Sequence, residues 1–394
     1  MNLTPTAVSD RAGTFTPVVT GADGYSAFLP HPLPPEPPVA IDVTQQHLLD
    51  RANQAVGRLD GMTVLLPDPD VLLYTYVRKE AVLSSQIEGT QSSLSDLLLY
   101  ENDAVPGVPI EDVRETSNYI AAMRHGVDSI AQGRLPLSGR LLREIHTILM
   151  HDARGGDKAP GEFRRLQVWL GGTRPQNARF VPPPANVVPG AMADLERFIH
   201  DADTPVPVLV KAALAHAQFE TIHPFLDGNG RVGRLLITLL LCAEDVLTRP
   251  LLYLSLHFKR HREIYYDRLQ RVRTHGEWEE WLAFFLEGVV DVAQETTRTT
   301  RDLVQMIERD RQVVAGFGRA AGTASQLYEL AVRRVVVTPK AARAQTGLSS
   351  PAVQAGLRRL EDAGILREIT GRRRGTVYAY DEYLMALNAG TERD

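Results

Sequence analysis

The sequence predicts a mainly α-helical fold that carries one short β-hairpin and ends in a small basic domain. Apolar residues recur at helical spacing in residues 48–59 and 71–83, which predicts helices there. Residues 161–172 alternate and end in two glycines, so with Phe180–Pro184 they predict a short hairpin, or flap, among the helices. A chain of 394 residues is long enough for two or three domains that each bury a core.

The helical part is expected to begin near residue 45. The segment before it contains Leu29–Pro38, whose closely spaced prolines exclude a helix and predict an extended course over the surface. A composition shift at 316–323 predicts a linker before the basic domain. The expected domains are an irregular proline-rich lead-in at 1–45, an N-terminal helical region at 46–110, a helical core at 111–315 and a C-terminal domain at 324–394.

The C-terminal domain is predicted to be a winged helix-turn-helix domain. Thr338 and Ser350 each precede a proline and start a helix, and Gly347 lies between the two helices. Two strands joined by the basic turn Arg372–Arg374 follow, which completes the pattern. The residues expected on or near the recognition helix, where they would contact DNA, are Ser349, Ser350, Gln354, Arg358 and Arg359. Winged helices also bind proteins, so both kinds of partner stay open.

The composition is that of an ordinary globular protein, with 44% hydrophobic and 23% charged residues. A net charge of −5 argues against the whole molecule being an electrostatic nucleic-acid binder. The single cysteine, Cys242, lies in an apolar run, so we expect a buried thiol and neither an internal disulfide nor a zinc site. The N-terminus lacks a signal peptide, and no apolar run reaches the ~20 residues that span a bilayer. We therefore expect a cytoplasmic protein without membrane contact.

The segment from His223 to Arg234 has the composition of a phosphate site beside a base. It reads His-Pro-Phe-Leu-Asp-Gly-Asn-Gly-Arg-Val-Gly-Arg, and the apolar run that follows predicts a buried helix. A helix N-terminus presents unpaired N–H groups and a positive dipole end, and arginines match phosphate oxygens. A histidine titrates near neutral pH and can take the proton of a hydroxyl nucleophile. Asp227 is suited to hold Mg²⁺, which bridges phosphate oxygens.

Two commoner phosphate motifs are excluded by their context. Gly228–Gly233 matches the dinucleotide pattern GxGxxG, but that pattern needs a preceding strand, whereas residues 208–222 are helical in period. A Walker A loop is excluded because no Gly-Lys-Ser or Gly-Lys-Thr follows.

The whole segment resembles the signature of the Fic family, H-x-F-x-[D/E]-G-N-G-R-x-x-R, and fills each specified position. Fic proteins are mostly helical and carry a flap before the signature, so the resemblance covers much of the chain and implies a Fic helical core. It implies a protein adenylyltransferase that moves AMP from ATP to a Ser, Thr or Tyr hydroxyl of a target protein, or of itself, and releases pyrophosphate. The implied roles are His223 as catalytic base, Asp227 as Mg²⁺ ligand, and Asp227, Gly228, Asn229, Gly230, Arg231 and Arg234 as ATP-binding residues. Phe225 is expected to pack in the core.

A second segment, Ser84–Gly89, resembles the inhibitory motif of the same family, [S/T]-x-x-x-E-[G/N]. Ser84 and Glu88 are four apart and share a helix face. Glu88 stands before Gly89, a natural helix end, so its carboxylate meets the negative end of the helix dipole and needs a cation or water. The resemblance implies that Glu88 pairs with Arg234, takes this arginine from the γ-phosphate and keeps resting activity low.

Weaker expectations concern the nucleotide pocket. Tyr265 and Tyr266 match a tyrosine pair that often lines the adenine pocket in the family, with packing inside a helix as the alternative. Leu170–Thr173, in the flap, is expected to border the nucleotide or to hold the target segment by strand addition.

Other functions remain open. The protein is alternatively a DNA-binding transcriptional regulator whose Fic core senses nucleotide, or an enzyme that moves UMP or phosphocholine or removes AMP. The intact His223 favours the enzyme, because a sensor needs no base. The oligomeric state is open as well, a homodimer included.

Overall fold

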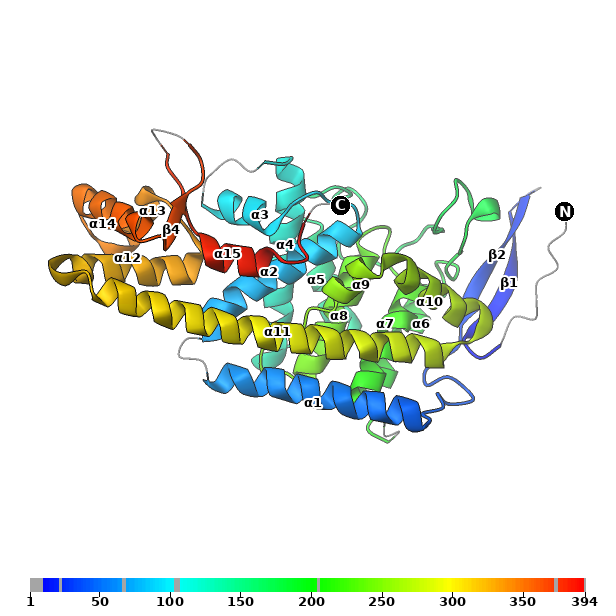
Figure 1. Ribbon diagram of the computed structural model, residues 1–394. Helices are drawn as coiled ribbons and strands as arrows, with labels where there is room; N and C mark the ends of the chain where they lie inside the picture. The colour runs from blue at the N-terminus through cyan, green and yellow to red at the C-terminus, as the bar shows by residue number, and fades with distance from the viewer. Residues whose placement is uncertain are drawn as a thin grey trace. The chain divides into compact units, whose positions relative to one another are not determined.

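The computed structural model describes residues 10–20, 23–65, 69–102, 107–203, 206–371 and 375–392 (Figure 1). The chain divides into two compact units, each built from two stretches of sequence. The first unit comprises residues 1–60 and 118–293, and the second comprises 61–117 and 294–394. The boundaries fall inside three long helices: α1 (Val43–Leu65), α4 (Ile110–Ala131) and α11 (Trp278–Ala315).

The first unit begins with a β-hairpin where an irregular lead-in was expected, so that expectation is wrong for residues 13–20 and 23–30. Strands β1 (Gly13–Thr20) and β2 (Asp23–Pro30) pair antiparallel, with Gly13 opposite Pro30. The sequence pattern for these two strands is weak because Pro17 lies within β1, and proline is tolerated only in an edge strand. Beyond Pro30 the proline-rich stretch is irregular, as expected, up to α1.

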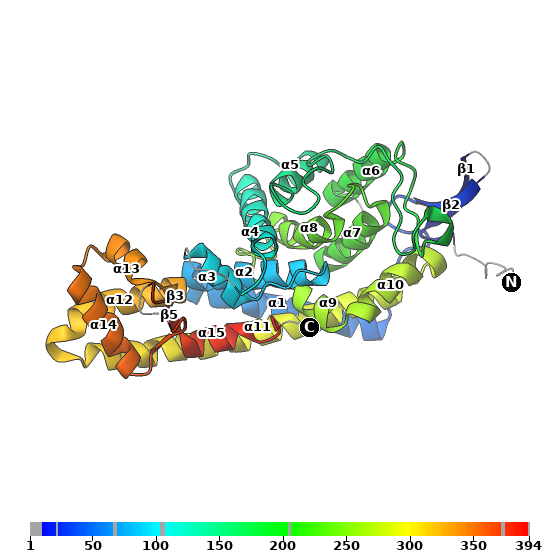
Figure 2. The same cartoon turned by 90° about the horizontal axis from the view of Figure 1, so that it is seen from above.

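Helices make up most of the rest of this unit. Helices α7 (Val208–Ile222) and α8 (Asn229–Ala243) form its centre and lie side by side in both views (Figure 2). α7 is buried on every side from Leu209 to Ile222, which accounts for its alanine- and leucine-rich sequence. α8 is buried from Arg231 to Leu241. The other helices that lie wholly in this unit are α5 (Gly139–Leu149), η1 (Pro175–Asn177), α6 (Val188–His200), α9 (Ser255–Arg260) and α10 (Arg262–His275).

The predicted flap is present, but one bridge between two residues takes the place of a full hairpin. Leu170 and Phe180 form a single antiparallel bridge, and η1 closes the loop between them. The N–H of Leu170 donates to the carbonyl of Phe180 at 2.8 Å. Gly172 has a φ of 74°, and a Cβ there would lie 2.4 Å from the carbonyl oxygen of Asn177, so this turn requires glycine.

The second unit contains α2, α3, the C-terminal helices and a three-stranded antiparallel sheet of order β3-β5-β4. The two expected C-terminal helices are confirmed, and the side chains of Thr338 and Ser349 cap them. The basic turn Arg372–Arg374 lies outside the described residues. The elements are α2 (Pro69–Ile87), α3 (Leu94–Glu101), η2 (Gly318–Ala320), α12 (Ala321–Arg334), β3 (Val336–Val337), α13 (Pro339–Thr346), α14 (Ser350–Asp362), β4 (Leu366–Glu368), β5 (Tyr378–Tyr380) and α15 (Asp381–Asn388).

Within the described ranges, none of the helices combines the length and the apolar character that crossing a bilayer demands.

Candidate active site

His223 caps the C-terminus of α7 in a left-handed conformation, with φ 50° and ψ 63°. Its N–H donates to the carbonyl of Phe219 at 2.9 Å. The imidazole is 16% exposed, and its Nδ1 lies 4.0 Å from Oε2 of Glu220. A left-handed backbone costs a non-glycine residue roughly 1–2 kcal/mol, so the surroundings must hold His223 in place.

The turn that follows is held by the side chain of Asn229. Its amide accepts the N–H of Phe225 at 2.8 Å and donates to the carbonyl of the same residue at 2.9 Å. Gly228 has a φ of 75°, and a Cβ there would lie 2.9 Å from the sulfur of Met150. Phe225 is fully buried, so the expectation that it packs in the core is confirmed.

His146, from α5, supports the same turn from outside the signature. Its ring stacks on Phe225 with centroids 3.8 Å apart. Its Nδ1 accepts the N–H of Gly161 at 2.8 Å, and its Nε2–H donates to the carbonyl of Asp227 at 3.1 Å. Burial lowers the pKa of His146 to about 4, so the ring is neutral at pH 7 and both nitrogens hold main-chain groups.

Asp227 provides the only carboxylate among the residues of the signature, His223 to Arg234. Its Oδ2 accepts from Nζ of Lys158 at 2.9 Å, and its Oδ1 accepts the N–H of Gly228 at 2.7 Å. Burial raises the pKa of Asp227, but these hydrogen bonds and the charges of Lys158 and Arg231 outweigh it and lower the pKa below its usual value. Proteins often bind Mg²⁺ through one or two carboxylates together with substrate phosphates and water, and an ionised Asp227 fits that role.

α8 starts at Asn229, directly after this turn, so its first N–H groups open toward the end where Asp227 lies. Arg231 and Arg234 are both buried, at 4% and 2% exposed. The guanidinium of Arg231 lies 4.0 Å from Oδ1 of Asp227. The structure thus joins His223, Asp227, the start of α8 and Arg231 into one compact site within the first unit.

Comparison with known proteins agrees with this geometry. Residues 46–128 match the Fic/DOC family N-terminal model, and residues 136–241 match the Fic/DOC family model, which includes the whole signature. The chain carries a Fic domain.

The relatives of the Fic domain are named protein adenylyltransferases. The protein adenylyltransferase Fic of Culex quinquefasciatus is 30% identical over 251 residues, which are 60% of this chain and 47% of the relative. Its counterpart in Aedes aegypti is 32% identical over 252 residues, which are 63% and 46% of the two chains. The chain therefore spans about half the length of these curated relatives.

Solved structures agree with the fold. A Fic family protein from Desulfovibrio desulfuricans G20 superposes with a TM-score of 0.56 at 21% identity, over 86% of this chain and 96% of that chain. Fic-1 from C. elegans gives a TM-score of 0.52 at 21% identity, over 66% and 76% of the two chains. The mainly α-helical Fic fold is thus confirmed.

Outside the Fic core, Ser84 and Glu88 lie at the C-terminal end of α2. α2 ends at Ile87, so Ser84 is in its last turn and Glu88 is the first residue after it. The N–H of Glu88 donates to the carbonyl of Ser85 at 3.0 Å, and Gly89 has a φ of 99°. Ser84 is fully buried.

The two tyrosines expected at the adenine pocket differ in exposure. Tyr265 is 1% exposed, lies 4.5 Å from the ring of Phe258 and donates its hydroxyl to Nε2 of His216 at 2.9 Å. Tyr266 is 37% exposed. Tyr265 therefore packs inside the core, and Tyr266 is the one with ring surface to offer a nucleotide.

Sequence reasoning missed four residues of the site: His146, Lys158, Arg164 and Glu220. They come from separate segments, and three of them lie well before the signature, so the spacing of residues holds no sign of them. Arg164 is 2% exposed whereas its neighbour Arg165 is exposed, and nothing in the sequence distinguishes these two arginines.

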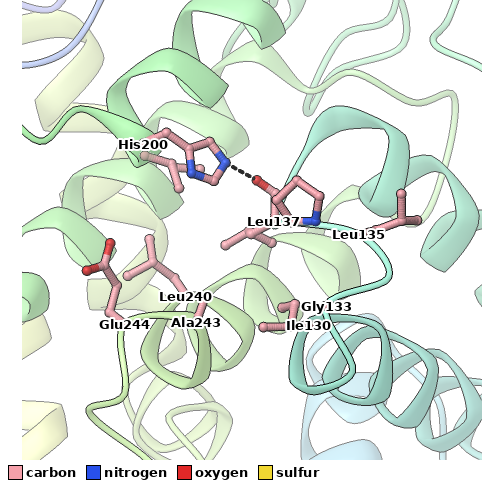
Figure 3. A pocket seen from close by; sticks show the side chains of 10 residues that line it. Ile130, Gly133, Leu135, Leu137, His200, Leu240, Ala243 and Glu244 are labelled. Carbon is pink, nitrogen blue, oxygen red and sulfur yellow. Dashed lines mark hydrogen bonds between the residues drawn. The ribbon is translucent and has the colours of Figure 1, made fainter.

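A cavity of about 320 Å³ lies at the opposite end of α8 (Figure 3). The ends of α4, α6 and α8 line it, and Nε2–H of His200 donates to the carbonyl of Leu137 at 2.7 Å on its wall. Leu240, Ala243 and Glu244 of α8 also line it. A helix of this length puts the cavity roughly 20 Å from the start of α8, so it is separate from the signature.

Proposed function

We propose that the Fic domain transfers AMP from ATP to a hydroxyl of a target protein, itself included. The observation that carries the proposal is that a turn held by Asn229 connects His223, at the end of α7, directly to the N-terminus of α8. The names of the relatives support the same chemistry.

The reaction is a substitution at the α-phosphorus of ATP. His223 takes the proton of a Ser, Thr or Tyr hydroxyl, whose oxygen forms a bond to the α-phosphorus. The bond from that phosphorus to the bridging oxygen breaks, and pyrophosphate leaves with the electron pair. Arg231, Arg234 and the first N–H groups of α8 offset the charge of the phosphates.

Asp227 would hold Mg²⁺, which when bound neutralises phosphate charge. The lowered pKa of Asp227 supports this role, because the carboxylate is ionised at neutral pH. Lys158 contacts the same carboxylate through a half-exposed side chain. Lys158 would therefore turn away when the ion arrives, and the hydrogen bond from Gly228 would keep the carboxylate in place.

The test is label transfer from α-labelled ATP to a cell lysate and to the protein itself. The wild type is expected to label a protein band in the presence of Mg²⁺, whereas His223→Ala is expected to lose about 10²–10⁴-fold in rate, the usual worth of a general base. Equal labelling by both proteins would contradict the proposal. Labelled UTP, run in parallel, decides between AMP and UMP transfer.

We also propose that Glu88 and Ser84 regulate this activity, with Glu88 as the partner of Arg234. The match to the inhibitory motif supports the proposal. The buried hydroxyl of Ser84 and the glycine directly after Glu88 fit a helix end built to present one carboxylate.

A second candidate, DNA binding, is favoured by the surface of α14. Gln354, Arg358 and Arg359 are exposed on this helix, which Ser349 caps. Phosphates and base edges are the partners that such residues contact. DNA retardation that is unchanged by His223→Ala would assign the two activities to separate sites.

A further inference from the structure

Arg164 is a buried cation whose hydrogen bonds all go to main-chain carbonyl groups. It is 2% exposed, and it lies between the flap and the signature. Its Nε–H donates to the carbonyl of His223 at 2.8 Å, and Nη2–H donates to those of Ile222 at 3.4 Å and Pro183. Nη1–H donates to the carbonyl of Leu166 at 3.1 Å.

The main chain of Arg164 adds a further contact, because its N–H donates to the carbonyl of Pro224 at 2.8 Å. The carbonyls of Ile222, His223 and Pro224 are therefore all held by this one residue. They surround the left-handed backbone of His223, which needs external support.

The other acceptors belong to the flap. Leu166 lies before the bridge of Leu170 with Phe180, and Pro183 lies after it, so Arg164 joins both limbs of the flap at their base. A guanidinium presents five N–H groups in a rigid planar fork, which suits carbonyls in several directions, whereas a lysine offers one point charge. A buried charge costs free energy, and burial lowers the pKa of Arg164 to about 10.

We propose that Arg164 is a positioning residue for the transfer: it holds the backbone of His223 in the reactive arrangement and fixes that arrangement to the base of the flap. Four of its five side-chain N–H groups donate to carbonyls, so we assign it the holding of the main chain and no part in phosphate binding. This inference rests on the proposed AMP transfer for its kinetic consequence, but the placement of His223 is measurable by itself.

The test compares Arg164→Met, Arg164→Lys and the control Arg197→Met in the full chain. Arg197 is an arginine of α6 whose side chain is 72% exposed, and it pairs with Asp194 in the same helix. We expect Arg164→Met to lower kcat for AMP transfer about 10²-fold, since a misplacement of about 1 Å costs a rate of this order. The dissociation constant for ATP, from equilibrium dialysis, should change less than about threefold. Arg164→Lys should recover part of the loss, to about tenfold below wild type, and Arg197→Met should match wild type.

The second measurement does not depend on turnover. Diethyl pyrocarbonate modifies accessible imidazoles, and mass spectrometry resolves the rate at His223. We expect this rate to rise at least about threefold in Arg164→Met and to stay at the wild-type value in Arg197→Met.

Each outcome either supports or overturns the proposed role of Arg164. A lower kcat at constant ATP affinity together with faster modification of His223 supports the proposal. Unchanged kcat, unchanged modification, or ATP affinity that falls in step with kcat overturns it. Failure of both Arg164 variants to fold also overturns it, because Arg164 would then be a determinant of the fold. If wild type transfers no AMP while modification still responds, the proposed function fails and the hold on His223 stands.

Discussion

Asn229, His146 and Arg164 are buried polar side chains that bond main-chain groups around the signature. Asn229 holds Phe225, His146 holds Asp227, and Arg164 holds His223. Buried main-chain polar groups need partners, and an irregular turn cannot supply them from a helix or sheet ladder. At this scale, the glycines let the turn bend and the polar side chains select one of the shapes that the glycines allow.

His216 shows what such burial does to stability. Its Nδ1–H donates to the carbonyl of Gly233 at 2.8 Å, and its ring is fully buried among Phe258, Tyr265 and Trp281. Burial lowers the pKa of His216 to about 3, assisted by the charges of Arg234 and Arg273, although the bond to Gly233 raises it. The native ring therefore stays neutral at pH 5, where an unfolded histidine, with a pKa of about 6.5, is protonated.

The unfolded state thus binds more protons than the native state between pH 6.5 and 3, so stability decreases as the pH is lowered through this window. His216 should contribute a loss of about 2 kcal/mol in unfolding free energy between pH 7 and pH 5. Urea unfolding of His216→Phe is expected to show a correspondingly smaller loss than wild type. His151→Phe, at a histidine whose side chain is 74% exposed, serves as the control and should keep the wild-type slope. An identical pH dependence in all three proteins would contradict the assignment.

At the scale of elements, the sequence predicts the capped helices better than the first hairpin. Unbroken helical periodicity and capping residues mark α5, α13 and α14 clearly. The strands β1 and β2 lie beside a proline-rich stretch, and two short strands gain their stability from contacts far along the chain, such as the N–H of Phe28 with the carbonyl of Val181. The local sequence pattern of residues 13–30 does not predict such long-range contacts.

Gly233 lies where α7 and α8 pack closely. A Cβ on Gly233 would lie 2.5 Å from Oε1 of Glu220 and 3.1 Å from Cδ1 of Phe219, so Gly233→Ala must displace the buried Glu220 carboxylate and crowd the ring of Phe219. We expect the free energy of unfolding to fall by about 1–3 kcal/mol, the usual cost of overpacking. Gly190→Ala in α6 is the matched control, because nothing lies within 4 Å of its added Cβ. This control should stabilise the protein by up to about 1 kcal/mol through helix propensity. Chemical unfolding that finds the two variants alike would reject the packing argument.

At the scale of the whole molecule, the signature was predictable and its supporting residues were not. His223 to Arg234 is continuous in sequence, so its residue types alone indicate a phosphate site with a base. Lys158 and Arg164 reach the site only because the loop after α5 and the flap fold against it, and those contacts depend on the tertiary structure. The two compact units are likewise each built from separated stretches, which the domains expected in sequence order do not reproduce.

The proposed brake by Glu88 is the prediction that involves the whole chain. Removing its carboxylate in Glu88→Gly is expected to free Arg234 for the γ-phosphate and to raise AMP transfer at saturating Mg·ATP by roughly 5–150-fold, the range of a coupling of 1–3 kcal/mol. Glu88→Gln, which keeps the size and loses the charge, should also raise the rate.

Glu111→Gln removes an exposed carboxylate from the first turn of α4 and is the control that should leave the rate unchanged. Transfer rates by Glu88→Gly equal to those of wild type would show that Glu88 does not restrain the enzyme.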